Sequence, residues 1–149
     1  MSIKSQQSNM KRLSQLLSKS LGYIFGDRES GPNGAKAEFH AKGRAFLRAL
    51  AKDLKLREYR AHSNYAGIAV SGEVYLYGMW SDGNGLMICL EQPTLGNQVI
   101  YYHSIVSMDD HRGGQNHFIS LSALRSEDYH MLVNRLLRLR QEDAHARVA

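Results

Sequence analysis

The sequence predicts an α+β domain in which an antiparallel β-meander of three to four strands packs with two N-terminal helices and one C-terminal helix. The main observation is the segment 68–77, where apolar and polar side chains alternate with a period of two, as in a half-buried strand. On either side of the strand region, apolar residues recur with helical spacing instead. With 149 residues, 43% of them hydrophobic and 22% charged, the chain has the size and composition of one globular domain, 1–149.

Two helices precede the strands. The first begins at residue 10, and its apolar stripe comprises Met10, Leu13, Leu17, Leu21 and Ile24. Residues 1–9 are polar, and we expect them to be flexible. After a turn-rich segment at 27–34, a second helix covers residues 35–56, with Gly43 allowing a neighbouring backbone to approach closely. Its buried face is expected to comprise Phe39, Phe46, Leu47, Leu50 and Leu54.

Segments rich in turn residues separate the first strands. A short strand at 59–62 and the long strand at 68–77 flank a turn at 63–67. Residues 81–85 carry two glycines with Asp and Asn, which is a strong hairpin signal, and they lead into a strand at 86–91. Because this last strand is apolar on both faces, we expect it to occupy a central position in the sheet.

The C-terminal third continues with a turn at 92–98, a strand at 99–106 and a loop at 108–116. One face of that strand is expected to carry Val99, Tyr101, His103 and Ile105. Ser126 is the expected N-cap of the last helix, with the two following acids in its first turn. The apolar side of this helix comprises Tyr129, Leu132, Val133, Leu136 and Leu139. Residues 141–149 are expected to be flexible.

Several classes of protein are excluded by what the sequence lacks. No run of 18 apolar residues is present, so no membrane span is predicted. The N-terminus lacks the apolar core and cleavage site of a secretory signal. The single cysteine, Cys89, lies in an apolar run and is expected to be buried, which leaves no disulfide within the chain. We therefore expect a cytoplasmic protein.

Basic residues are concentrated in the second helix. Residues 36–57 contain seven Lys or Arg against two acids, a surplus of five that equals the net charge of the whole chain. Basic side chains recur every four residues and predict one stripe about 24 Å long on the helix. The stripe comprises Lys36, His40, Arg44, Arg48 and Lys52. It could track a phosphate backbone, meet an acidic protein surface, or form the solvated back of the helix.

A polar loop offers an alternative function. His103, Asp110, His111 and His117 could supply the ligands of a divalent metal, which would make the protein a small metal-dependent hydrolase or nuclease. Their spacing matches no metal signature, so we expect no metal and no cofactor. The glycine pair after Arg112 could instead form a backbone nest for an anion. No nucleophile elbow, P-loop or dinucleotide-binding motif is present, and these absences favour a non-catalytic function.

Tyrosines are frequent in the strand region: Tyr59, Tyr65, Tyr75, Tyr77, Tyr101 and Tyr102. On an open sheet face, tyrosines can stack on bases or anchor a protein interface. As ordinary cross-strand pairs they stabilise the sheet, which is the interpretation we favour for most of them.

Three segments carry a resemblance to known proteins: AEFHAKGRAFLRALAKDLKL, YRAHSNYAGIAVSGEVYLYG and HRGGQNHF. Over about 35–120 the chain resembles small accessory proteins encoded by phages and plasmids. The resemblance implies an accessory protein of a mobile genetic element, acting in the cytoplasm of a bacterial host. Small basic proteins of that kind bind nucleic acid or block a host defence complex such as a CRISPR effector, and both activities use a binding face without an active site.

We therefore expect a non-catalytic binding protein that engages nucleic acid or a nucleic-acid-handling complex. The metal-dependent hydrolase and a virion or assembly component are the alternatives. The expected partner-binding residues are Lys36, Arg44, Arg48, Lys52, Arg60, Asn64, Tyr65, Arg112 and Asn116.

Overall fold

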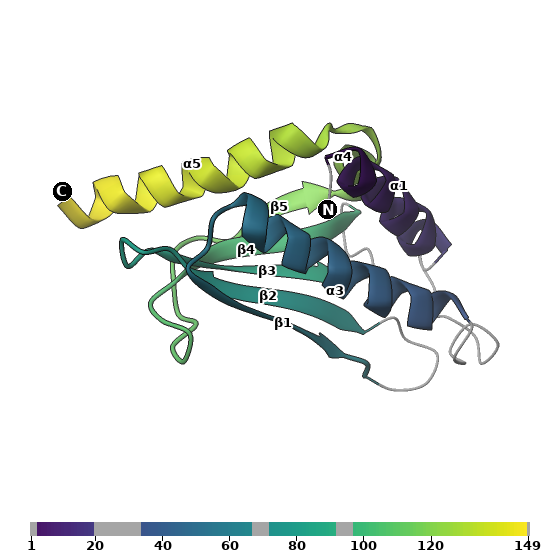
Figure 1. Ribbon diagram of the computed structural model, residues 1–149, viewed down its shortest axis with the longest axis horizontal. Coiled ribbons are helices and arrows are strands. Elements are labelled where there is room, and N and C mark those ends of the chain that lie inside the picture. Colours follow the sequence, from purple (N-terminus) through teal and green to yellow (C-terminus); the bar gives the residue numbers. More distant parts are fainter. Residues whose placement is uncertain (1–2, 20–33, 67–71, 92–96, 149) are drawn as a thin grey trace.

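The computed structural model describes residues 3–19, 34–66, 72–91 and 97–148, and it confirms the α+β class (Figure 1). The elements are α1 (Ile3–Lys19), α3 (Ala35–Asp53), β1 (Glu58–Asn64), β2 (Glu73–Met79), β3 (Gly85–Glu91), β4 (Gln98–Ile105), β5 (His117–Ser120), α4 (Leu121–Ser126) and α5 (Tyr129–Val148).

One antiparallel sheet contains all five described strands, in the order β1-β2-β3-β4-β5. The apolar strand β3 is central, as its sequence predicts. The sheet has five strands where the sequence predicts three to four, because β5 was missed. That strand has only four residues and follows a polar loop, so it shows too little alternation to be recognised.

The helices lie on one face of the sheet. In Figure 1, α3 lies across the sheet over β1 and β2, while α5 runs alongside β4. α1 packs against α3, α4 and α5. The main hydrophobic core lies between these helices and the sheet, and alternate residues such as Val74 and Leu76 of β2 point into it.

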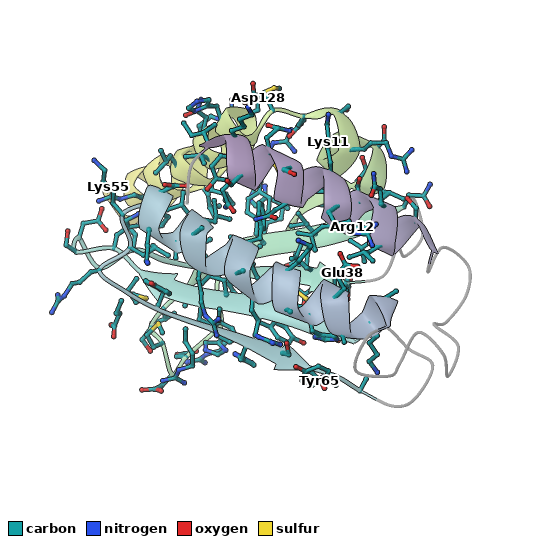
Figure 2. The ribbon with its side chains drawn as sticks, turned by 45° about the vertical axis from the view of Figure 1, so that its right-hand side comes forward. Lys11, Arg12, Glu38, Lys55, Tyr65 and Asp128 are labelled. Carbon is teal, nitrogen blue, oxygen red and sulfur yellow. The ribbon has the colours of Figure 1, made fainter. Side chains whose placement is uncertain are left out.

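α3 confirms the predicted helical periodicity. All five residues of its expected apolar face, from Phe39 to Leu54, are buried. An added Cβ at Gly43 would lie 3.1 Å from Cγ2 of Val74, so the glycine lets α3 approach β2 as expected. On the other side of α3, Arg12 of α1 forms a two-point ion pair with Glu38, with nitrogen–oxygen distances of 2.6 Å (Figure 2). Core packing and this ion pair fix the rotation of α3.

Element boundaries differ from prediction at several places. α1 begins at Ile3 and not at residue 10, because Gln6 also packs inward and donates to the Phe46 carbonyl at 3.1 Å. Val99 packs into the main core together with Ile100, since a register shift between Gln98 and Ile100 interrupts the alternation expected for β4. The predicted residues 21, 24 and 68–71 lie outside the described part of the chain.

The predicted cap of the last helix is wrong. Ser126 is the last residue of α4, a short helix that the sequence analysis missed and that is capped by Ser120. Oδ1 of Asp128 accepts a hydrogen bond from the backbone N–H of His130 at 2.8 Å, which makes Asp128 the capping side chain of α5. The expected apolar side of α5, from Tyr129 to Leu139, does face the core.

Candidate functional site

The predicted basic stripe of α3 is exposed only in its C-terminal half. Lys36 is 6% exposed and His40 is 0% exposed, so neither belongs to an accessible surface. Arg44 is half-buried, whereas Arg48 and Lys52 are exposed. The predicted stripe is therefore accessible only from Arg44 onward, and Lys36 is too buried to be the partner contact that the sequence predicts.

The helical repeat explains this division. A spacing of four residues exceeds the 3.6-residue turn, so each step rotates the side chain by about 40° and five positions sweep about 160°. Lys36 starts on the buried side of α3, in the same direction as Gly43 and Leu47. The stripe turns outward through Arg44 and reaches solvent at Arg48.

Arg44 attaches α3 to the end of β1. Its Nη1 donates to Oγ of Ser63 at 2.6 Å and to the hydroxyl of Tyr65 at 2.8 Å. The Tyr65 ring in turn lies 4.2 Å from the His40 ring. Both acceptors of Arg44 are neutral hydroxyl groups, so these contacts orient the guanidinium without cancelling its charge.

β1 is the edge strand on the side covered by α3. From Arg44, which faces β1, the side chains of Arg48 and Lys52 turn by about 40° and 80° toward the side of α3 that points away from the sheet. Arg57 and Arg60, at the start of β1 and within it, are also exposed. We name this set the β1-edge surface: Arg44, Arg48, Lys52, Arg57 and Arg60. Figure 2 shows Lys55 at the end of α3 and Tyr65 near the end of β1, which mark its two ends.

The nearby acids leave this surface positive. The four ion pairs among the described residues use other cations, from Arg12, Arg112, Arg135 and Arg140. Asp53 accepts a hydrogen bond from the Tyr129 hydroxyl at 2.5 Å and is thereby directed toward α5. Glu58 is the exposed acid within β1 itself.

The sheet face opposite the helices carries a row of side chains, aromatic except for Cys89, that crosses all five strands. Consecutive register partners on this face are His62, Tyr75, Cys89, Tyr101 and Phe118. No described helix lies over this face. A small second core of Met87, Cys89 and Ile105 is shielded there by tyrosine rings, while Phe118 is 53% exposed.

Four rings gather on this face next to β1. The Tyr75 and Tyr77 rings are parallel within 8°, with centroids 5.9 Å apart, and His62 stacks against both. His111, from the loop between β4 and β5, stacks on Tyr77 at 3.8 Å. Burial, and then the charges of Arg60 and His111, lower the pKa of His62 below its ordinary value. The neutral imidazole of His62 is therefore favoured beside the Arg60 guanidinium.

The loop 106–116 packs back on β4 and forms no anion nest around Arg112. An added Cβ at Gly113 would lie 1.4 Å from the Ser104 carbonyl oxygen, and the N–H of Gly114 donates to Oγ of Ser104 at 3.0 Å. Arg112 donates from its side chain and its backbone to Asp110, and the guanidinium lowers the pKa of that carboxyl to about 2. The glycines therefore serve close packing, and Arg112 is paired within the loop.

The predicted metal ligands do not converge. His103 lies on the helix-free sheet face, with Nδ1 2.7 Å from the Ser104 carbonyl oxygen, whereas His117 stacks on Tyr102 on the helix-covered face.

Within the described residues, one group has ligand atoms close enough together for a metal, all within 4.8 Å: Glu73, Cys89 and Glu91. Burial raises the pKa of the Cys89 thiol, and burial followed by the charge of Glu73 raises that of Glu91. Both shifts favour protonated groups, which bind metal poorly.

Of the remaining expected contacts, Asn64 and Tyr65 are neighbours at the end of β1, whereas Asn116 lies apart from them. Oδ1 of Asn64 accepts from the N–H of Ala66 at 3.2 Å, so this side chain shapes the turn after β1. Tyr65 is 49% exposed beside α3. Asn116 is exposed just before β5, across the sheet from β1.

Sequence reasoning missed His62 and Phe118 as members of the aromatic row. Within its own strand, each residue alternates onto the helix-free face. The row forms only because the pairing register places the residues of the five strands opposite one another. Alternation within each strand was the available signal, and it cannot align one strand with the next.

Comparison of the chain with protein-family models, with curated proteins and with solved structures finds no match. Among the described helices, none combines the length and the hydropathy that a bilayer crossing requires.

Proposed function

We propose that this protein is a non-catalytic binding protein whose partner is nucleic acid, held through the β1-edge surface. The observation that carries the proposal is a set of five cations on α3 and at β1, the helix and the strand at one edge of the sheet, none of them in an ion pair among the described residues. Neutralising backbone phosphates releases their condensed counterions, which supplies sequence-independent affinity.

A purely structural role explains only part of this surface. Charged residues on an edge strand protect it from pairing with other chains, and Arg60 would suffice for that on β1. Arg48 and Lys52 lie on α3, where they cannot shield the strand backbone. Like charges one turn apart also destabilise a helix by a few tenths of a kcal/mol per pair. A polyanionic partner would give these side chains a function that edge protection does not.

The aromatic rings next to the edge favour nucleic acid over an acidic protein. Arg60 and Tyr77 are register partners across β1 and β2, so a guanidinium and an aromatic ring stand side by side. Cationic grooves combined with aromatic rings are typical of surfaces that bind nucleic-acid strands.

Charge reversal at matched positions tests the proposal. The double variant Arg48→Glu/Arg60→Glu should lose binding to a fluorescently labelled oligonucleotide at low salt, measured by anisotropy. The control Arg125→Glu/Arg138→Glu changes net charge equally, at exposed positions on α4 and α5, and should retain most of the affinity. If both variants lost affinity equally, the loss would come from the change in net charge and not from the β1-edge surface. If the unmodified protein did not bind the oligonucleotide, the proposal would be refuted.

We also propose, on the sequence resemblance alone, that the protein serves a mobile genetic element in the bacterial cytoplasm and engages a host nucleic-acid-handling or defence complex. Affinity capture from a host lysate, with and without nuclease treatment, tests this wider role. Partners that are lost on nuclease treatment are held through nucleic acid. A partner retained after nuclease treatment would favour direct inhibition of a protein complex.

A further inference from the structure

We infer that the sheet face next to β1 is a base-stacking platform, so that the nucleic acid bound is single-stranded. The inference rests on the proposed function and names its ligand class. The platform comprises His62, Tyr75 and Tyr77, with Arg60 at its margin and the His111 ring stacked on Tyr77. Every base has a flat aromatic face, and stacking on protein aromatics is a sequence-tolerant source of affinity for single strands.

The positions of the charges and rings match the two parts of a nucleotide strand. The β1-edge surface supplies cations for phosphates at the margin of the sheet. One strand further in, Tyr75 and Tyr77 of β2 face the side that no described helix covers. Neighbouring strands lie about 4.8 Å apart, so a chain following β1 on this face can contact Arg60 with its backbone and the rings with its bases. The cations of α3 lie beyond the same edge, on the helix-covered side.

His111 shows where a planar group fits. Its ring lies nearly parallel to the Tyr77 ring, at 17° and a centroid distance of 3.8 Å, which is the geometry of a stacked base. Apart from this stacking, the exposed imidazole is held by its Nε2, 2.7 Å from the Met108 carbonyl oxygen within the loop. A base entering the platform would take the place of His111 on Tyr77.

Acids limit the platform at its far end. Asn64, Glu73 and Glu91 are register partners in the row beyond His62, so two carboxyl groups lie on the same face. Phosphates would be repelled there, which confines the strand to the end that carries Arg60 and Tyr77. Arg60, an exposed cation of the β1-edge surface, lies at that end.

Duplex nucleic acid could meet the same cations but not the rings. Its bases are already stacked inside the helix and must be unstacked before they contact an aromatic side chain. The distinguishing quantity is therefore the ratio of single-strand to duplex affinity. Cross-strand aromatic pairing, the interpretation favoured from the sequence, stabilises the sheet but predicts no such ratio.

The experiment compares one labelled oligonucleotide, single-stranded and annealed to its complement, in anisotropy titrations of the full chain. We expect the unmodified protein to prefer the single strand. Tyr77→Leu should weaken single-strand binding about fivefold or more and leave duplex binding unchanged, whereas Tyr77→Phe, which keeps the ring, should retain the preference.

Equal affinity for the two forms, or an unchanged ratio in Tyr77→Leu, would overturn the platform while leaving the proposed function standing. Failure to bind either form would instead refute the proposed function. If Tyr77→Leu does not fold, His111→Ala provides the test, because its side chain is on an exposed loop. That variant should bind the single strand more tightly and the duplex equally, and weaker single-strand binding would contradict the inference.

Discussion

The salt dependence of binding gives the sharpest quantitative prediction from the β1-edge surface. Four of its cations, from Arg48, Lys52, Arg57 and Arg60, are exposed. Each phosphate contact to a single strand contributes about 0.7 to the slope of log K against log salt concentration. If all four make contacts, the slope is about −3, and affinity falls about 50-fold between about 50 and 200 mM salt.

Neutral substitutions should remove a calculable part of that slope. In Arg48→Gln/Arg60→Gln two contacts are lost, so the slope should fall to about −1.4 and the loss over the same salt range to about sevenfold. Because both side chains are exposed and in no ion pair among the described residues, the thermal midpoint should change little.

Anisotropy titrations at several salt concentrations measure both slopes. Arg125→Gln/Arg138→Gln is the matched control and should keep the steep slope of the unmodified protein. A slope near zero would mean that phosphate contacts do not drive binding. The reasoning would also be refuted if the β1-edge double variant kept the full slope, because the contacts would then lie elsewhere.

Three further predictions concern the fold. Leu76→Ala, at a fully buried position of β2 beneath α3, should lower the free energy of unfolding by about 2–5 kcal/mol in urea titrations. Cys89 is buried with a raised thiol pKa, so it should react with a thiol reagent such as Ellman's reagent only after unfolding, and rapid reaction of the native chain would contradict its position. Glu91 has a raised pKa in the fold, because of burial and the charge of Glu73. The stability that comes from protonated Glu91 is therefore present in acid and is lost as the pH rises through the folded-state pKa. We expect Glu91→Gln to raise the free energy of unfolding at neutral pH and to leave it unchanged in acid.

Much of the fold was predictable because it depends on local periodicity. The apolar positions of α3 and α5, the hairpin before β3 and the central place of β3 follow from spacing and turn chemistry. α4 and β5 were missed because a helix of six residues and a strand of four complete too few repeats to reveal a period.

The candidate site was predictable only in part. The spacing of four residues predicted a basic stripe in which Arg48 and Lys52 are exposed, but the same stripe included Lys36 and His40, which the rotation of α3 buries. His111 and His117 are close in sequence but lie on opposite faces of the sheet, since His111 stacks on Tyr77 whereas His117 begins β5 and faces the helices. The aromatic platform depends on the register between strands, which cannot be read from the residue pattern of any one strand.

The most direct test of the account is a nuclear magnetic resonance titration of isotopically labelled protein with a short unlabelled single strand. The account predicts that signals of Arg60, His62, Tyr75 and Tyr77 shift progressively, while signals of α1 and α4 stay in place. Shifts centred on α1 and α4, with the β1 and β2 signals unmoved, would contradict it.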